Sequence, residues 1–324
     1  MMGAPVHFVI NPAGASGRTL KEWQKLERKL FTEHRDFLEH YSTRSESIED
    51  IVRDLSSTAD EISIVIVGGD GSMNEAVNGI LNFDTVKLGM IPCGSGNDLA
   101  KALQLSEDTD ELVEMVFDGS VKREQDVGRV KFHTVSERMN SEGFEPFEDE
   151  NIIRRFNISA GIGFDAEICA AAALSPRKLT LNQMHMGKLI YIEEAIRIVK
   201  QQQRFHLTCR QDNVEKKYEE CLLAVAMNTK YEGGGFMFCP EADGDDGMLD
   251  FCVGDHLSTL DFYKIFPYAY SGAHVKFEGI ETGRADRLEL QTDTPMTVHT
   301  DGEVHYRSNH ITIQLEEKKL RMLV

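Results

Sequence analysis

An aspartate flanked by glycines follows a strongly apolar segment. Residues 62–67 read ISIVIV, which predicts a strand buried on both faces, and residues 68–72 read GGDGS. Apolar residues then recur at helical spacing from Met73 to Leu81, so the glycines lie between a strand's carboxyl end and a helix N-terminus. Such a turn binds anions through free N–H groups, and a carboxylate among phosphates requires a divalent cation or a network of water molecules between them. The loop therefore favours a magnesium–nucleotide complex, and a tight packing turn is the alternative on these residues alone.

Two similar loops of small polar residues follow other predicted strands. Residues 6–10 are apolar and lead into NPAGASG at 11–17, and residues 86–91 lead into PCGSGND at 92–98. Each loop precedes a predicted helix. This alternation of strands and helices predicts a parallel sheet with helices on both faces. Because loops after parallel strands gather at one edge of the sheet, we expect the three loops to converge there on a ligand.

The pattern changes beyond residue 125, where strand-like segments are separated by turns such as Asp-Gly. We expect a mainly antiparallel β domain, interrupted by helices over about 186–201 and 259–271. The acidic run from 142 to 150 contains Gly and Pro and predicts an exposed loop. The strand-like segments are 126–133, 155–160, 205–210, 221–228, 248–253, 287–291, 296–300 and 311–315.

The length and composition of the chain limit the classes of protein to which it can belong. A chain of 324 residues with 41% hydrophobic and 27% charged residues predicts two globular domains. Its 35 basic and 54 acidic residues give a formal charge of −19, which disfavours nucleic acid and broad electrostatic docking on anionic lipid. No apolar run approaches the ~18 residues of a membrane span, and the start of the chain lacks the basic region of a signal peptide. The six cysteines form no CxxC pair. We therefore expect a cytoplasmic protein with reduced thiols.

Taken together, the order and spacing of short motifs resemble the diacylglycerol kinase catalytic-domain family, especially its soluble bacterial lipid kinases. The resemblance covers nearly the whole chain. Two departures are visible, since Ser72 and Ser95 replace the threonines usual in that family, and both keep a hydroxyl. The motifs are Asn11-Pro12; Gly68-Gly69-Asp70-Gly71-Ser72 with Asn74-Glu75; Pro92-x-Gly94-Ser95-x-Asn97-Asp98; Asp126; Gly163-Phe164-Asp165-Ala166; Gly233-Gly234-Gly235 with Pro240; Asp246-Gly247-x-Leu249-Asp250; and Asp301-Gly302-Glu303.

The resemblance implies an α/β plus mainly β fold. An N-terminal parallel α/β nucleotide-binding domain of the NAD kinase and diacylglycerol kinase type, residues 1–125, would be followed by an antiparallel β-sandwich domain, residues 126–305. A C-terminal strand from about 306–324 would return to the first domain, with a cleft between the two. The implied ATP site comprises Asn11, Thr43, Gly68, Gly69, Asp70, Gly71, Ser72, Asn74, Glu75, Gly94, Ser95 and Asp98.

Two metal sites and a catalytic base are also implied by the resemblance. Asp70, Asp98 and Asp126 would organise a catalytic Mg²⁺, and a second, structural Mg²⁺ would use the Asp243 carbonyl, Asp246 and the Met248 carbonyl. Oxygen-only ligands suit a hard cation, although a hairpin turn rich in surface carboxylates is the alternative. Glu303 would act as general base for a lipid hydroxyl, assisted by Asp301. Without the resemblance, residues 301–303 are a β-turn.

The implied function is an ATP-dependent lipid kinase that transfers the γ-phosphoryl group to a lipid hydroxyl. We expect diacylglycerol, giving phosphatidic acid, or a related lipid alcohol. The alternatives are an NAD kinase-like phosphotransferase and a catalytically silent nucleotide- or lipid-binding regulator. The stretch 233–240 and the turn 301–303 favour the lipid kinases over the NAD kinases. The expected partners are ATP, Mg²⁺ and the lipid, reached by transient contact with the inner face of the membrane, and relatives suggest a homodimer.

Overall fold

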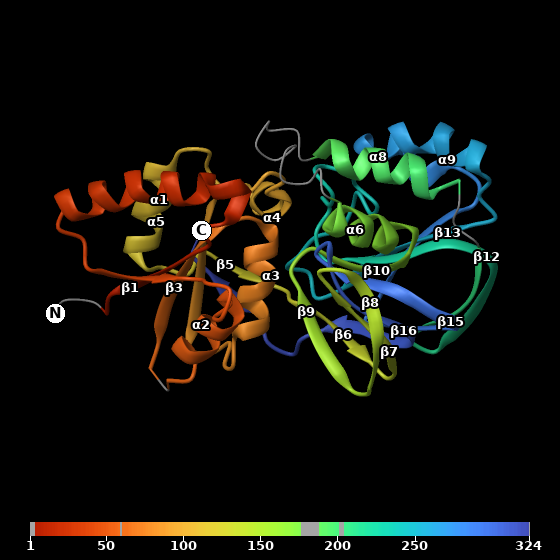
Figure 1. Cartoon of the computed structure of the whole chain (residues 1–324), viewed down its shortest axis with the longest axis horizontal. Helices are drawn as coiled ribbons and strands as arrows, with labels where there is room; N and C mark the ends of the chain where they lie inside the picture. The colour runs from red at the N-terminus through yellow and green to blue at the C-terminus, as the bar shows by residue number, and fades with distance from the viewer. Residues whose placement is uncertain (1–3, 59, 176–187, 201–203, 324) are drawn as a thin grey trace. The chain divides into compact units, whose positions relative to one another are not determined.

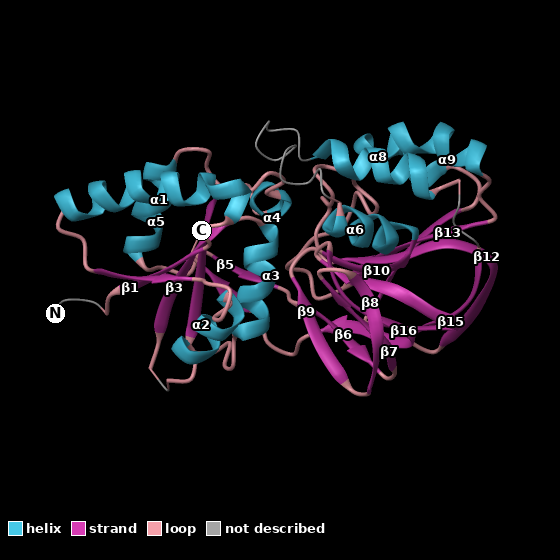
Figure 2. Cartoon of the chain, viewed as in Figure 1, coloured by secondary structure: helices cyan, strands magenta, loops and turns pink. Residues whose placement is uncertain are grey.

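The fold consists of two compact units, which are described separately. The structure is a computed structural model that describes residues 4–58, 60–175, 188–200 and 204–323. The first unit comprises residues 1–126 and 317–324, and the second comprises residues 127–316 (Figure 1). Helices and strands alternate in the first unit, whereas strands dominate the second (Figure 2).

The first unit is built on a parallel sheet. Its described strands lie in the order β2-β1-β3-β4-β17-β5, and only β5 runs antiparallel to its neighbour β17. The strands β1, β3 and β4 are almost wholly buried, as their apolar sequences predict. The bounds are β1 (Val6–Ile10), β2 (Phe37–Tyr41), β3 (Ile62–Gly68), β4 (Val86–Pro92), β5 (Arg123–Gln125) and β17 (Leu320–Met322).

Helices cover both faces of this sheet. The helices α1 (Gly14–Thr32) and α5 (Thr109–Asp118) lie on one face, where Trp23 of α1 is fully buried against strand residues (Figure 1). The helices α2 (Ile48–Leu55) and α3 (Asp70–Gly79) lie together on the other face. The short helix α4 (Asp98–Ala102) follows β4. This arrangement confirms the predicted α/β unit and brings the loops after β1, β3 and β4 to one edge.

The C-terminal return to the first unit is shorter than expected. We expected it to begin near residue 306, but β16 (Glu303–Leu315) belongs to the second unit. The reason is its pairing: β16 runs antiparallel to β15 (Arg287–Thr300) along its length, and residues 311–315 also pair with β6 (Gly128–Phe132). Only β17 enters the first sheet, between β4 and β5.

The second unit is an antiparallel sheet folded around its own core. Among the described residues the sheet has 11 strands, and its main path is β14-β13-β12-β10-β15-β16-β6-β9. The two 14-residue strands β12 and β15 each pair with both β10 and β11, so the sheet bends back on itself. The further bounds are β7 (Val135–Asn140), β8 (Gly143–Asp149), β9 (Ile152–Phe156), β10 (Ser159–Gly163), β11 (Phe205–Gln211), β12 (Val214–Met227), β13 (Leu249–Asp255) and β14 (Ile280–Ala285).

Three α-helices and two short 3-10 helices lie in the described part of this unit. The helix α6 (Phe164–Leu174) starts directly after β10, and α9 (Thr259–Ile265) continues into η1 (Phe266–Ser271), where Pro267 is at the start of the 3-10 helix. η2 (Ala273–Lys276) follows. Of the helix expected over 186–201, α8 (Lys188–Ile198) is present, and residues 186, 187 and 201 lie outside the described residues.

Two local expectations were wrong. The acidic run 142–150 is not a loop but contains β8, because this segment pairs with β7 and its Phe147 packs against Tyr306. The single strand expected over 155–160 is two strands, β9 and β10. The chain turns between them at Asn157, whose backbone N–H donates to Asp301 at 2.8 Å.

Candidate active site

The loops after β3 and β4 touch through their glycines. A Cβ on Gly69 would lie 2.8 Å from Cα of Gly94, and a Cβ on Gly94 would lie 2.6 Å from Cα of Gly69. The N–H of Cys93 also donates to the carbonyl of Gly68 at 2.7 Å. The two loops therefore meet backbone to backbone, and no side chain fits between them. This is the convergence that the sequence predicted for the edge of the sheet.

Asp70 connects the same two loops through its side chain. Its Oδ2 accepts a hydrogen bond from the backbone N–H of Asp98 at 3.0 Å, and its Oδ1 accepts one from Leu99 at 3.1 Å. These amides are the first of α4, where a carboxylate satisfies donors that have no partner within the helix. Both oxygens of Asp70 thus position the second loop.

The loop after β1 reaches the same place. Asn11 Nδ2 donates to Ser72 Oγ at 3.2 Å, which joins the first loop to the glycine loop. Arg18 of α1 donates to the carbonyl of Gly94 at 3.0 Å. Ser95 lies exposed in the second loop. Sequence reasoning missed Arg18, although the cation close behind the small residues 13–17 was a usable signal, since loop carbonyls attract guanidinium groups.

Two of the expected nucleotide residues shape the backbone around α2. Glu75 Oε2 accepts a hydrogen bond from the N–H of Ile48, the first residue of α2, at 2.9 Å. Thr43 Oγ1 accepts from the N–H of Glu46 at 3.1 Å and so closes the turn before that helix. Ser47 adds a capping box at the N-terminus of α2. The side chains of Glu75 and Thr43 therefore fix the start of α2.

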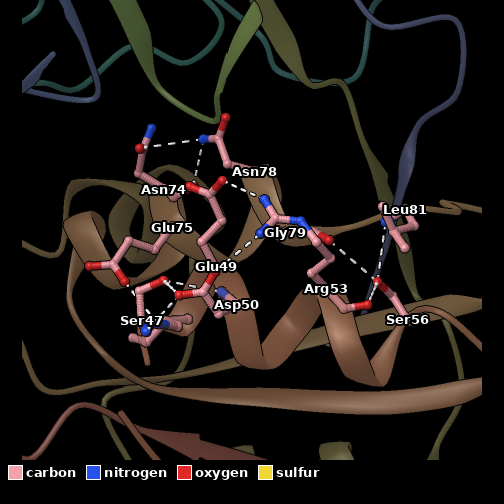
Figure 3. Close-up of polar contacts among 11 residues, drawn as sticks. Ser47, Glu49, Asp50, Arg53, Ser56, Asn74, Glu75, Asn78, Gly79 and Leu81 are labelled. Carbon is pink, nitrogen blue, oxygen red and sulfur yellow. Dashed lines mark hydrogen bonds and ion pairs between the residues drawn. The ribbon is translucent and has the colours of Figure 1, made fainter. Parts of the chain in front are cut away.

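The helix α3, which carries the glycine loop at its N-terminus, is fastened to α2 (Figure 3). Ser56 Oγ donates to the carbonyl of Gly79 at 3.4 Å and accepts from the N–H of Leu81 at 3.1 Å. A Cβ on Gly79 would collide with the carbonyl of Glu49. The side-chain amide of Asn78 donates a hydrogen bond to the backbone carbonyl of buried Asn74 at 2.8 Å. The helix that follows the glycine loop is thus held against α2 by several contacts.

The other two aspartates that the resemblance assigned to the catalytic Mg²⁺, Asp98 and Asp126, have cationic partners. Asp98 is 3% exposed and pairs with Lys101 at 2.7 Å, and Asp126 is 4% exposed and pairs with Lys319 at 3.2 Å. Since an unpaired buried carboxylate is costly, these lysines stabilise both charges. Within the described ranges, no group of three or more His, Cys, Asp and Glu side chains converges in an arrangement that could hold a metal ion.

In the second unit, Asp301 anchors the turn between β15 and β16. Its carboxylate accepts hydrogen bonds from the backbone N–H groups of Ile158 at 2.7 Å and Asn157 at 2.8 Å, and from a further amide at 3.1 Å. Asp301 and Gly302 both have positive φ, of 53° and 79°, as a two-residue hairpin turn requires. Glu303 follows on the exposed side, and no described residue is a hydrogen-bond or ionic partner of its carboxylate.

Next to this turn lies a buried cluster of one histidine and two acids. His299 Nε2 lies 2.7 Å from Asp165 Oδ2 and 3.6 Å from Glu232 Oε1, and His299 is 0% exposed. A Cβ on Gly161 would collide with the Asp165 carboxylate, so glycine is required there. Burial lowers the pKa of His299, but Glu232 and Asp165 outweigh it and raise that pKa to about 9. Burial likewise raises the pKa of Glu232 to about 7.

The same histidine reaches the turn itself. Its Nδ1 lies 3.2 Å from the backbone nitrogen of Gly302. His299 belongs to no metal-binding motif, so sequence reasoning did not single it out. The usable signal was its place two residues before Asp301, near the end of β15.

An apolar cavity of about 120 Å³ lies inside the second unit. Its wall is formed almost entirely by aromatic and aliphatic groups, and Asp165 and Glu232 are also among the residues that line it. Apolar residues that line it include Phe164, Ile168, Leu222, Phe236, Phe262 and Phe266. The cavity could not be foreseen from the sequence, since each of these side chains is equally suited to a closed core.

Comparison with known proteins decides the family. Residues 5–130 match the sequence model described as diacylglycerol kinase catalytic domain. Residues 159–323 match the YegS C-terminal NAD kinase beta sandwich-like domain. The chain belongs to the diacylglycerol kinase catalytic-domain family. The expected family and the expected order of α/β and β-sandwich domains are thereby confirmed.

Individual relatives of this family are distant but match over most of their length. YtlR of Bacillus subtilis (strain 168) is 24% identical over 304 residues, which cover 92% of each chain. The diacylglycerol kinase of Mycobacterium tuberculosis (strain CDC 1551 / Oshkosh) is 26% identical over 242 residues, covering 74% of this chain and 70% of that one. A crystal structure from Bacillus anthracis str. Sterne has a TM-score of 0.71 at 21% identity, covering 98% and 96% of the two chains, and shows the same fold.

The family resemblance also pointed to a structural metal near Asp246. In the structure, Asp246 Oδ1 accepts from the N–H of Met248 at 3.0 Å, and its other oxygen is paired with Arg284. Burial raises the pKa of neighbouring Asp250 to about 6; Arg284 opposes this rise, and the charges of Asp246 and Asp243 add to it. The oxygen donors and the excess of negative charge fit a hard cation.

No helix in the described part of the chain is long and apolar enough to cross a membrane.

Proposed function

We propose that this chain is an ATP-dependent lipid kinase that transfers the γ-phosphoryl group of ATP to a lipid hydroxyl. Diacylglycerol or a related lipid alcohol is the acceptor. The observation that carries the proposal is the backbone contact between Gly69 and Gly94, in a chain of the diacylglycerol kinase family. It creates a surface of bare peptide groups at a helix N-terminus, which suits phosphate.

The nucleotide is assigned to the first unit. The N–H groups of the loop 68–72 and the positive end of α3 would hold phosphate oxygens, with the hydroxyl of Ser95 exposed beside them. Asn11 keeps Ser72 in place, and Arg18 keeps the second loop against the first. Phosphoryl transfer depends mainly on such positioning and on neutralising charge.

Magnesium is assigned to the acids of the same unit. We assign it to Asp70, Asp98 and Asp126, which supply only hard oxygen donors. Because these carboxylates do not converge on one point in the described part of the chain, they would hold the ion partly through its water molecules. Bound Mg²⁺ would neutralise the charge of the phosphates. Before the metal binds, Lys101 and Lys319 balance the negative charges of Asp98 and Asp126. The second, structural Mg²⁺ is assigned to Asp246 with the carbonyls of Asp243 and Met248.

Glu303 is assigned the role of general base. A lipid hydroxyl loses its proton as it attacks phosphorus, and an exposed carboxylate without a competing partner among the described residues is suited to accept that proton. We assign Asp301 a positioning role rather than that of a second base. Its oxygens already accept three backbone N–H groups, which hold the turn that presents Glu303.

The apolar cavity of the second unit supports a lipid acceptor. A site whose wall is almost entirely hydrophobic fits the hydrocarbon part of a lipid better than a dinucleotide. The cavity and the turn that carries Glu303 belong to the same unit and are linked by His299.

Phosphotransfer from labelled ATP tests the proposal. The purified chain is assayed in mixed micelles against diacylglycerol, monoacylglycerol, a sphingoid base and undecaprenol, and in solution against NAD. We expect a labelled lipid and no labelled NAD. Phosphorylation of NAD alone would overturn the proposal, as would the absence of any labelled acceptor from protein that binds Mg-ATP.

A further inference from the structure

The helices α9 and η1 expose a stripe of apolar side chains. Leu260 is 70% exposed, and the side chains of Tyr263, Tyr268 and Tyr270 are 37%, 49% and 42% exposed. Exposed positions recur at 260, 263, 264, 267 and 268, which is close to helical spacing, so these side chains share one side of the helix. Three of the chain's eight tyrosines thus lie exposed within eight residues.

The opposite side of the same helices is apolar as well. Its residues line the apolar cavity, so this side is covered by the second unit itself. A surface helix normally opposes its apolar side with charged and polar residues, whereas a helix that is apolar on both sides requires apolar surroundings on both. The exposed stripe therefore marks an interaction surface. The inward residues are Phe262, Ile265, Phe266 and Ala269.

The helix α8 extends the stripe. The hydroxyl of Tyr263 donates to the carbonyl of Ile196 at 3.5 Å, and Thr259 Oγ1 donates to the carbonyl of Val199 at 3.4 Å, so α8 and α9 lie side by side (Figure 1). Ile196 is 44% exposed. Among the described residues, 5 of the 12 exposed large hydrophobic side chains lie on these helices, so they are concentrated here rather than scattered. The outer apolar surface comprises Ile196, Leu260, Tyr263, Tyr268 and Tyr270.

The charge of this segment differs from that of the whole chain. Residues 256–277 contain one acid, Asp261, and two lysines, Lys264 and Lys276, which give a formal charge of +1 in a chain of −19. The carboxylate of Asp261 accepts from the backbone N–H of Ser258 at 3.2 Å and lies 3.4 Å from Lys264. This segment therefore approaches a negatively charged membrane surface without the repulsion that acid-rich parts of the chain would experience.

We propose that the outer apolar surface docks on a lipid bilayer, with Leu260 among the acyl chains and the tyrosines at the level of the head groups. Tyrosine is suited to this depth because its ring is apolar and its hydroxyl stays hydrated. A second copy of the chain fits less well, since association would bring together two chains that each carry −19. The inference goes beyond the proposed lipid kinase function, and its test requires neither ATP nor an acceptor.

Co-sedimentation of the full chain with phosphatidylcholine vesicles tests the inference. Leu260→Ser and Tyr268→Ser should each weaken binding by about tenfold, because burying one such apolar side chain contributes about that factor. Both side chains are exposed, so the melting temperature should change little. The matched control is Val214→Ser. Val214 is 66% exposed at the start of β12, outside the outer apolar surface, and its variant should bind as the parent does.

Salt and lipid composition separate apolar docking from electrostatic docking. Since residues 256–277 carry a formal charge of only +1, binding should change little when salt is added or when half of the phosphatidylcholine is replaced by phosphatidylglycerol. Binding that requires phosphatidylglycerol and is abolished by salt would overturn the inference, because a basic patch elsewhere would then hold the membrane.

A tryptophan reporter locates the contact. The chain's single tryptophan, Trp23, is 0% exposed in the first unit, so brominated acyl chains should quench only the indole introduced by Tyr268→Trp. We expect its fluorescence to fall on brominated vesicles and to stay unchanged on ordinary ones. Vesicle binding without this quenching would show that another face docks.

The remaining outcomes separate docking from self-association and from catalysis. Parent-like vesicle binding by both serine variants overturns the inference. So does a parent dimer that Leu260→Ser converts to a monomer in light scattering, because the surface would then bind a second copy. Vesicle binding without phosphorylation of any lipid overturns the kinase proposal and leaves the docking surface standing. Phosphorylation of dispersed dioctanoylglycerol by protein that binds no vesicles has the opposite consequence.

Discussion

The Asp70 carboxylate accepts a hydrogen bond from the backbone N–H of Leu99 at 3.1 Å, which joins the loop after β3 to the helix after β4. A second bond, from the N–H of Asp98 at 3.0 Å, uses the other oxygen. The residue that the sequence singled out for its charge near phosphate therefore also sets the relative position of two loops. Replacing it changes both the charge and the geometry.

Asp70→Asn should weaken Mg-ATP binding together with turnover. Asparagine offers one acceptor oxygen instead of two, so one bond to the start of α4 is lost and the folded state is destabilised by about 1–2 kcal/mol. Calorimetric titration with Mg-ATP and urea unfolding measure the two effects. Unchanged nucleotide affinity in a folded variant would contradict the assignment of this residue to the nucleotide site.

Gly94→Ala should separate the two glycine loops. Its Cβ would lie 2.6 Å from Cα of Gly69, so the backbone must move, at a cost of about 1–3 kcal/mol and of nucleotide affinity. The control is Gly119→Ala. Gly119 has φ of +67°, and a Cβ there would have no atom within 4 Å, so alanine strains the end of α5 without touching the loops. Melting curves should fall for both variants, and affinity for Mg-ATP only for Gly94→Ala.

Glu303→Gln should lower turnover by about 10²–10⁴ and leave nucleotide affinity nearly unchanged. Glutamine keeps the shape of the side chain and loses its basicity, and general base catalysis contributes about this factor. Single-turnover phosphorylation at saturating lipid measures the chemical step. Retention of at least about a third of the parent rate would exclude Glu303 as the base. Asp301→Asn should instead lower thermal stability, since it disturbs three backbone hydrogen bonds.

His299 should make stability depend on pH in the alkaline range. Glu232 and Asp165 raise its pKa from 6.5 to about 9 against the effect of burial, and Asp301 contributes in the same direction. A raised pKa stabilises the folded state fully below pH 6.5, and this contribution is lost as pH rises through about 9. Urea unfolding should therefore show lower stability at pH 9 than at pH 6.5.

His299→Gln should flatten that dependence and lower stability at neutral pH, because it leaves two carboxyl groups without a cation. The control is His206→Gln, an exposed histidine paired with Glu219 at 2.9 Å. It should keep the parent's slope of stability against pH. A parent-like slope in His299→Gln would show that another group titrates in this range.

Asp246→Asn should abolish most of the stabilisation by Mg²⁺ of the native protein. A metal that binds only the folded state raises the melting temperature by mass action. We expect the parent's melting temperature to rise across a Mg²⁺ titration without nucleotide, and that of the variant to change little. Parallel curves for parent and variant would remove the structural metal from the proposal.

Local sequence pattern was sufficient for the first unit's architecture. The apolar runs of β1, β3 and β4 and the glycines that follow them are short-range signals, since a strand buried on both faces and a helix start each leave a mark within about ten residues. The order of the loops along the chain then implied their convergence, because carboxyl ends of parallel strands share one edge. The spacing of the motifs further indicated the family.

Only the tertiary structure decided which polar groups meet inside the second unit. Asp165 and His299 are 134 residues apart, and nothing in either local sequence predicts their contact. The β8 strand was hidden because its exposed acids resemble a loop, while its inward Phe147 has a partner, Tyr306, on a distant strand. Burial, and with it the cost of an unsatisfied oxygen, depends on which segments pack together. For this reason the sequence predicted the glycine loops, whereas the buried cluster of His299, Asp165 and Glu232 could be found only in the folded chain.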